Sequence, residues 1–120
     1  MNADPRPAPR LPVAILWHMH QPQYRDALSG EYVLPWTYLH ALKDYSDMAA
    51  HLEEVPGAKA IVNFTPVLIE QLDEYAERIA LHLRGGQPIG DPLLATLGSE
   101  PLPTGDAARL ALLRALLRAH

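Results

Sequence analysis

The chain has 120 residues, of which 48% are hydrophobic and 20% are charged, and its formal net charge is -4. This composition suits one compact domain with a modest core and excludes a disordered or fibrous protein. The acidic balance argues against nucleic acid as a partner, because nucleic-acid-binding surfaces normally carry a basic stripe. The absence of cysteine excludes disulfides, thiolate zinc sites and cysteine nucleophiles.

The N-terminal residues predict neither a membrane anchor nor a secretion signal. No stretch approaches the roughly 18 apolar residues that span a bilayer, and the apolar core of a signal peptide is missing. We therefore expect a cytoplasmic protein without a membrane partner. Residues 1–12 are rich in proline and charge, which predicts a flexible tail in an extended, solvated conformation.

A strand and a helix are predicted directly after this tail. Residues 13–17 form a short apolar run, typical of a strand that is covered on both faces. Residues 18–34 lack periodicity and are predicted to form a loop. A helix is predicted from Pro35, which suits the first helical position, to near Val55, because apolar residues follow at helical spacing.

The second half of the chain repeats this order. A strand is predicted over residues 60–64, and a helix follows it, with Thr65 as the N-cap and Pro66 as the first residue. This helix is predicted to end at two glycines, residues 85–86. Its acidic residues are predicted to face water, with one ion pair at i,i+4: they are Glu70, Asp73, Glu74 and Glu77, and the pair is Glu74 with Arg78.

Residues 87–105 are predicted to be a connector, because prolines and glycines leave room for only a helical turn at residues 93–97. A third helix is predicted from Asp106, a capping residue. Its buried side is predicted to consist of leucines: Leu110, Leu113, Leu116 and Leu117. The whole order predicts two parallel strands joined by a right-handed crossover. Since a two-stranded parallel sheet does not stand alone, we expect part of a larger α/β unit, or a sheet completed by a partner.

The residues behind the first predicted strand carry the most chemistry. His18 and His20 are two positions apart, so extended geometry places both imidazoles on the same side of the chain. In parallel α/β folds, ligands bind at this end of the strands. Three interpretations stay open: the pair binds sugar hydroxyls, it binds a metal such as zinc, or it supports the loop.

Three further candidates lie around the same edge of the predicted sheet. Gln21 adds an amide, and Trp36 offers an aromatic face that suits a sugar ring. Asn63 leaves the second strand at this edge, where it suits either ligand contact or a turn. These residues suit a polar, hydroxyl-rich ligand, and simple packing is the alternative for Trp36.

The carboxylates do not form the pair that glycoside hydrolysis requires, because they fall mostly on predicted exposed helix faces. Asp44 is the exception, and it either faces the site or pairs with a lysine. A metal site lacks a third ligand at a recognisable spacing, and the sequence contains no nucleophile elbow and no phosphate-binding loop. We therefore predict binding groups and no catalytic residue in this chain.

Four blocks in this order resemble the N-terminal region of family 57 glycoside hydrolases. They are WHMHQP (17–22), GEYVLPW (30–36), LHALKDYSDMA (39–49) and NFTPVLIEQL (63–72). The resemblance implies an α/β fold, the N-terminal portion of an incomplete (β/α)7 barrel formed by residues 13–120. It implies retaining hydrolysis or glucan transfer on α-glucans such as starch or maltodextrin, as in α-amylases, 4-α-glucanotransferases and branching enzymes.

The resemblance also implies which residues contact the substrate. His18 and His20 are expected near the scissile bond, with Gln21, Trp36 and Asn63 as further contacts. No cofactor or metal is implied, and the catalytic glutamate and aspartate are expected on later strands. The chain alone is then expected to be inactive and to pair with the remainder of the barrel. Two alternatives stay open: a free-standing carbohydrate-binding or assembly module, and a metal-dependent protein similar to polysaccharide deacetylases.

Overall fold

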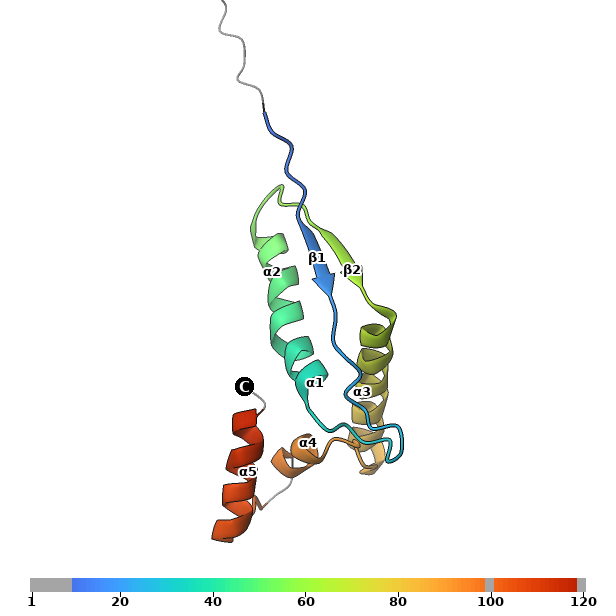
Figure 1. The fold of residues 1–120 in the computed structure, drawn as a ribbon, viewed down its shortest axis with the longest axis vertical. Helices are drawn as coiled ribbons and strands as arrows, with labels where there is room; N and C mark the ends of the chain where they lie inside the picture. The colour runs from blue at the N-terminus through green and yellow to red at the C-terminus, as the bar shows by residue number, and fades with distance from the viewer. Residues whose placement is uncertain (1–9, 99–100, 119–120) are drawn as a thin grey trace, which may run out of the picture.

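A computed structural model describes residues 10–98 and 101–118 of the chain. Residues 1–9 of the predicted tail lie outside this range, and residues 10–12 are exposed. The described elements run in chain order: β1 (Leu16–Met19), α1 (Trp36–His40), the π-helix η1 (Ala41–Tyr45), α2 (Ser46–Glu54), β2 (Ile61–Phe64), α3 (Pro66–Gly85), α4 (Pro92–Leu97) and α5 (Asp106–Arg118). This order confirms the predicted strand, helix, strand, helix pattern with a further C-terminal helix (Figure 1).

The two strands pair in parallel, as predicted. The register places Leu16 opposite Ile61 and His18 opposite Asn63. β1 begins later than the predicted range of 13–17, because the ladder starts where the Ile15 carbonyl accepts a hydrogen bond from the Ile61 N–H (2.9 Å). The structure is therefore mixed α/β with two parallel strands and several helices.

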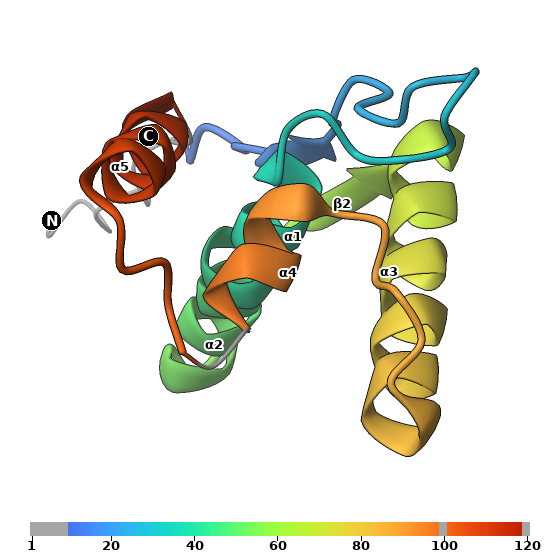
Figure 2. The same ribbon diagram turned by 90° about the horizontal axis from the view of Figure 1, so that it is seen from below.

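Only one face of the strands is covered, and only in part, since Val62 and Phe64 on the same side as Met19 are 40% and 43% exposed. The prediction of a strand buried on both faces is therefore wrong. Met19 is 5% exposed, whereas Leu16 and Ile61 are 60% and 59% exposed. The crossover helices α1 and α2, and also α3, extend to the same side of the two strands (Figure 2). We call the opposite side, which carries Leu16, His18 and Ile61, the open face of the sheet.

The buried core lies between α1, α3 and the segment that precedes α1. Leu68 and Tyr75 on α3 are almost fully buried, and so is Tyr32. The rings of Tyr32 and Tyr75 lie 4.2 Å apart at their centroids. This core joins the loop of residues 20–35 to α3, so the chain that leaves β1 is held against a long helix.

The helix α3 keeps its predicted limits for reasons that are visible at each end. Pro66 is its first residue, and Gly86 ends it in the left-handed conformation with φ 68°. Thr65 is the N-cap residue, as predicted, but its hydroxyl forms no capping hydrogen bond. Its buried Oγ1 has no partner among the described residues. The N–H of Leu68, the third helical residue, donates instead to the backbone carbonyl of Thr65 (3.0 Å).

The predicted buried side of α5 is wrong for three of its four leucines. Leu116 does turn toward α4, where it lines a small cavity with Leu93 and Leu97. Leu110, Leu113 and Leu117 are 49%, 56% and 76% exposed. The helix instead turns its small residues Ala108, Ala111 and Ala115, together with Leu112, toward α4 and the segment before α1, where they line a cavity of about 580 Å³. The described part of the chain contains no helix long and apolar enough to cross a membrane.

Candidate functional site

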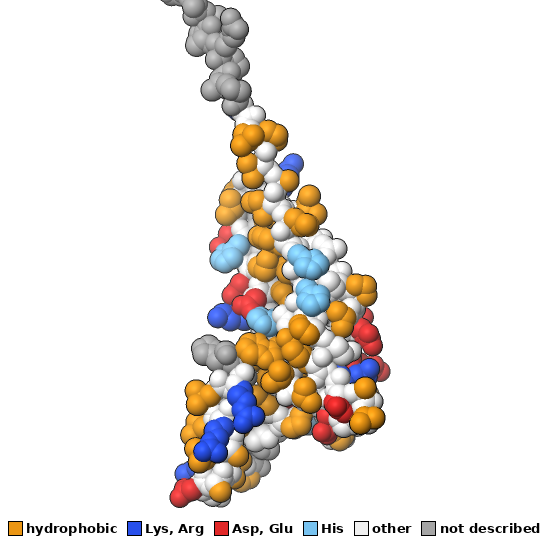
Figure 3. Space-filling model, in the orientation of Figure 1, with side chains coloured by type: hydrophobic (Ala, Val, Ile, Leu, Met, Phe, Trp, Pro, Cys, Tyr) orange, Lys and Arg blue, Asp and Glu red, His pale blue; other side chains and the backbone are white. Residues whose placement is uncertain are grey.

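The predicted histidine pair lies on the open face of the sheet. The rings of His18 and His20 are nearly parallel, with centroids 6.0 Å apart and an angle of 12° between the planes. Both side chains are exposed. Period-two geometry along β1 explains the alignment, because alternate residues of an extended chain point to the same side. On the face shown in Figure 3, histidine side chains lie among hydrophobic ones.

Asn63 joins this pair across the strands. Its position opposite His18 in the parallel register brings its Oδ1 to 2.7 Å from the Nδ1 of His18. Three of the five predicted site residues, His18, His20 and Asn63, are therefore neighbours in the structure. We call them the histidine cluster.

Gln21 has a different role in the structure, because both ends of its amide are occupied. Its Nε2 donates to the hydroxyl of Tyr45 (3.2 Å), and its Oε1 accepts from the hydroxyl of Tyr24 (3.0 Å). Burial, and the neighbouring Tyr45, raise the pKa of the Tyr24 hydroxyl above its usual range. The amide thus ties the start of the loop to η1, a contact that the sequence did not reveal.

Trp36 packs against His40 on the same helix rather than against the histidine cluster. The two rings lie 5.7 Å apart at an angle of 21°. His40 Nδ1 is hydrogen-bonded to Asp44 Oδ2, so the partner of Asp44 is a histidine and not the predicted lysine. The fifth predicted site residue therefore belongs to a second group, made of Trp36, His40, Asp44 and Tyr45.

The π-helix η1 explains how this second group assembles. A π-helix bonds each residue to the one five positions along and often appears at functional sites. Residues four and five positions after His40 both lie near it: Asp44 binds its ring, and the Tyr45 ring lies 6.2 Å away. Tyr45 in turn accepts the hydrogen bond from Gln21. The wider turn thus links the helix to the segment that follows the histidine pair.

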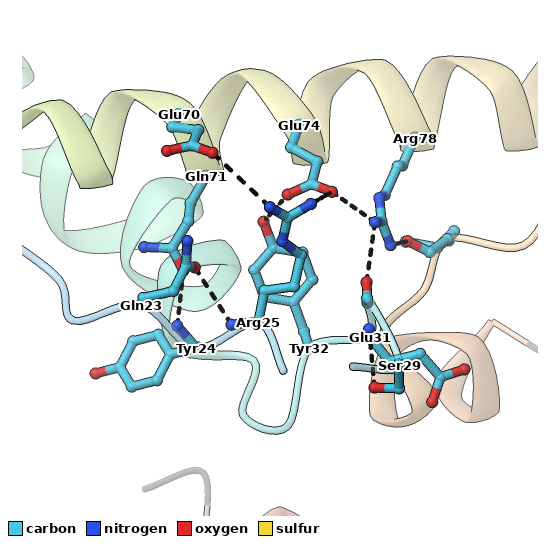
Figure 4. Close-up of polar contacts among 12 residues, drawn as sticks. Gln23, Tyr24, Arg25, Ser29, Glu31, Tyr32, Glu70, Gln71, Glu74 and Arg78 are labelled. Carbon is cyan, nitrogen blue, oxygen red and sulfur yellow. Dashed lines mark hydrogen bonds and ion pairs between the residues drawn. The ribbon is translucent and has the colours of Figure 1, made fainter. Parts of the chain in front are cut away.

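Gln71 anchors this segment to α3, and it is completely buried. Its Oε1 accepts from the Tyr24 N–H (3.1 Å) and from the Thr37 hydroxyl (3.3 Å). Its Nε2 donates to the carbonyls of Pro22 (2.9 Å) and Val67 (3.1 Å). One amide therefore fixes the backbone that leaves the histidine cluster and the start of α1 on one helix (Figure 4).

Glu74 forms a second anchor one turn further along α3 (Figure 4). It accepts hydrogen bonds from the Tyr32 hydroxyl (2.8 Å), Arg25 (3.1 Å) and Arg78 (2.5 Å). The structure confirms the predicted i,i+4 pair of Glu74 with Arg78. The prediction that Glu74 faces water was wrong, because its side chain is only 19% exposed. Arg78 also donates to the Gly30 carbonyl (3.0 Å).

The protonation states of Glu74 and Tyr32 follow from their surroundings. Burial raises the pKa of Glu74, but the Tyr32 hydroxyl and the charges of Arg78 and Arg25 outweigh it, and the net pKa is lowered. Burial and the hydrogen bond to Glu74 raise the pKa of Tyr32 well above its usual range. The carboxylate is thus held ionised and the phenol neutral, which is the state that keeps the anchor closed.

The larger cavity lies apart from the histidine cluster. It opens between the segment of residues 29–35, α4 and α5, and none of its lining residues belongs to a strand. Asp91, the buried carboxylate in its wall, is already engaged by the N–H groups of Leu93 and Leu94 and by the Tyr75 hydroxyl. Within residues 10–98 and 101–118, no three histidine, aspartate or glutamate side chains gather in a way that could hold a metal ion.

Comparison of the chain with known protein families identifies the family to which it belongs. The model of Glycosyl hydrolase family 57 matches residues 14–89, which include both strands, the π-helix and all five predicted site residues. The chain belongs to glycosyl hydrolase family 57. No curated protein and no solved structure matches it.

Family membership gives the chain a glycoside hydrolase role, and hence a carbohydrate substrate. The match ends at residue 89, within the loop between α3 and α4, so α4 and α5 lie outside it. The histidine cluster, η1, Gln71 and Glu74 all lie within the family 57 match. The cavity beside α5 is partly lined by residues beyond it.

Proposed function

We propose that this chain is the N-terminal part of a cytoplasmic family 57 enzyme that acts on α-glucans by retaining hydrolysis or glucan transfer. Residues 13–120 form part of its catalytic domain, an incomplete (β/α)7 barrel. The histidine cluster supplies half of the sugar-binding site. The observation that carries this proposal is the position of His18, His20 and Asn63 together on the face of the sheet that no helix covers.

The position of this face supports a role inside a barrel. In (β/α) barrels the helices form an outer ring, and ligands bind where the carboxyl ends of the strands meet. Here the helices α1, α2 and α3 lie on one side of the strands (Figures 1 and 2). His18 and Asn63 lie on β1 and β2, and His20 directly follows β1. Further strands at the open edges would enclose the histidine cluster.

The chemistry of the histidine cluster suits hydroxyl groups. A neutral imidazole carries one donor and one acceptor, and an amide carries both kinds of group. Such groups pair with sugar hydroxyls without requiring a charged ligand. Gln21 and Trp36 contribute to the site from its rim, Gln21 by holding the loop and Trp36 by its aromatic face beside His40.

We further propose that the two catalytic carboxylates lie outside this chain, on strands that complete the barrel. The carboxylates near the predicted site are already engaged: Asp44 binds His40, and Glu74 binds two arginines. Neither is free to attack an anomeric carbon or to protonate a leaving group. The chain alone then binds maltooligosaccharide weakly and hydrolyses none of it.

Titration of the chain with maltohexaose, followed by the histidine signals in NMR spectra, tests this function. We expect the His18 and His20 signals to shift, and the shifts to disappear in a His18→Ala, His20→Ala double variant. His51→Ala is the matched control, because His51 is an exposed histidine on α2 whose side chain is 75% exposed. Binding should be unchanged in that variant.

Three outcomes would contradict the proposal. Release of reducing sugar at an enzyme-like rate would place the catalytic carboxylates within the chain. Stoichiometric zinc that survives dialysis and is lost in the double variant would favour the metal-dependent alternative. A stable oligomer that binds maltohexaose without further strands would favour a free-standing binding module.

A further inference from the structure

The two ring nitrogens of His18 have different surroundings. Nδ1 lies 2.7 Å from Asn63 Oδ1, on the neighbouring strand, because the register places these two residues opposite each other. An amide oxygen accepts hydrogen bonds and has no proton to donate. In the neutral imidazole, the ring proton is therefore held on Nδ1, and Nε2 keeps its lone pair.

His20 provides the contrast within the same histidine cluster. Its ring is nearly parallel to that of His18 at 6.0 Å, and it is similarly exposed. It follows the last residue of β1, beyond the paired positions, so no residue of β2 lies opposite it. Among the described residues no hydrogen bond fixes its ring, so its two tautomers are free to exchange.

We infer that Asn63 is a positioning residue that holds His18 in the Nδ1–H tautomer and presents Nε2 as a hydrogen-bond acceptor. The nature of the ligand rests on the proposed function, but the tautomer does not. A neutral acceptor requires a ligand that donates a proton, and a sugar hydroxyl does so. A carboxylate or a fully ionised phosphate has no such proton. Asn63 thus biases the histidine cluster toward neutral polyols.

The tautomer of each histidine is measured directly from its nitrogen chemical shifts. Long-range ¹H–¹⁵N correlation spectra of the ¹⁵N-histidine-labelled chain, recorded at a pH where the nitrogen shifts themselves identify neutral rings, report the ratio of the two tautomers. We expect His18 to be mainly Nδ1–H. Asn63→Ala removes one hydrogen bond of ordinary strength, which should lower the ratio of Nδ1–H to Nε2–H about fivefold. His20 should not change.

Asn63→Asp is the matched variant, because it keeps an acceptor oxygen beside Nδ1 and should retain the Nδ1–H tautomer. The inference is overturned if His18 of the parent chain is mainly Nε2–H, which would mean that the amide nitrogen faces the ring. It is equally overturned if Asn63→Ala leaves the His18 ratio unchanged. Should Asn63→Ala fail to fold, the parent chain and Asn63→Asp still decide the question.

A maltohexaose titration of the same samples separates this inference from the proposed function. If both hold, Asn63→Ala weakens binding in proportion to the fall in the Nδ1–H fraction of His18, and acetate does not compete. A His18 tautomer that depends on Asn63 in a parent chain that does not bind maltohexaose would support the positioning role and contradict the proposed function.

Discussion

Glu74 is the residue whose charge contributes most directly to the stability of the fold. It is a partly buried carboxylate between Arg25 and Arg78, and its pKa is lowered in the folded chain. A lowered pKa stabilises the folded state at pH values above the usual glutamate pKa, near ~4.3, and this stabilisation is lost as the pH falls through the folded-state value.

We expect Glu74→Gln to lower the free energy of unfolding by about 1–3 kcal/mol at pH 7, because the amide keeps an acceptor but loses its charge. The difference from the parent chain should shrink toward zero as the pH falls below 4. Urea denaturation at a series of pH values measures it. Glu70→Gln is the control, since Glu70 is 64% exposed and lies 3.8 Å from Arg25; its effect should stay below about 0.5 kcal/mol. Equal effects of the two substitutions would show that Glu74 is no more than a surface ion pair.

Gln71 is the second residue whose substitution should be costly. Gln71→Leu keeps the volume but leaves the Tyr24 N–H and the Pro22 carbonyl without their partner. We expect a loss of about 2–4 kcal/mol in the free energy of unfolding, because each unpaired buried group costs about 1–3 kcal/mol. Gln23→Ala, on the exposed side of the same loop, should change it by less than about 0.5 kcal/mol. If Gln71→Leu does not lower the free energy of unfolding, water must replace the hydrogen bonds of the amide.

The residues of the histidine cluster could be predicted from the sequence, and their anchors could not. The alignment of His18 with His20 follows from local strand geometry, and the approach of Asn63 follows from the rule that parallel strands share an edge. Gln71 and Glu74 contact residues more than 40 positions away. Their pattern on the helix is that of ordinary polar positions, so no local signal distinguishes them from solvated side chains.

At the scale of elements, the path of the chain between α3 and α4 depends on one glycine. Gly90 has φ 76°, and a Cβ at this position would lie 1.7 Å from Arg78 Nη1. Arg78 donates to the Ile89 carbonyl and reaches Glu74, so the guanidinium cannot move without breaking these bonds. Glycine is therefore required at position 90, both for the left-handed conformation and because a Cβ would not fit beside Arg78.

We expect Gly90→Ala to destabilise the chain more than Gly57→Ala does. Gly57 has φ 82° with open space around it, so its substitution costs only the strain of the left-handed conformation, about 1–2 kcal/mol. Gly90→Ala adds the displacement of Arg78. Thermal unfolding of both variants tests the difference. Equal losses would indicate that Arg78 moves aside freely.

The type and order of the elements could be predicted, but the packing of α5 could not. Proline, glycine and apolar spacing define the ends of α3 within a residue or so. In α5 both the leucines and the alanines recur at helical spacing, and Leu112 and Ala115 are the half-buried residues that face the cavity beside α4. No residue of α5 is buried, so the helix packs too loosely for hydrophobicity alone to select its inner face.

At the scale of the whole molecule, the open face of the sheet is the main exposed apolar surface of the strands. Leu16 and Ile61 lie opposite each other there and are more than half exposed. We expect Leu16→Lys combined with Ile61→Glu to reduce self-association of the chain in sedimentation velocity. The free energy of unfolding should change by less than about 1 kcal/mol, because opposite charges on facing residues are tolerated.

Met19→Lys is the control, since Met19 lies on the covered face of the same strand and is 5% exposed. It should cost at least about 2 kcal/mol, because a buried unpaired charge is strongly unfavourable. If the double variant on the open face is as damaging as Met19→Lys, that face is covered in solution, and the location of the histidine cluster must be revised.

The π-helix also constrains the length of the chain. Each residue of an α-helix advances the side-chain direction by about 100°. η1 accommodates an extra residue between α1 and α2 by widening one turn. Deletion of a single residue from 41–43 would allow the turn to close into a regular α-helix. Because a π-turn absorbs one extra residue, α2 would keep its direction relative to α1, and only the contacts inside the turn would change. Tyr45 would become the fourth residue after His40, the place that Asp44 holds in the structure. The extra residue therefore serves the side chains around His40 and not the course of the helix.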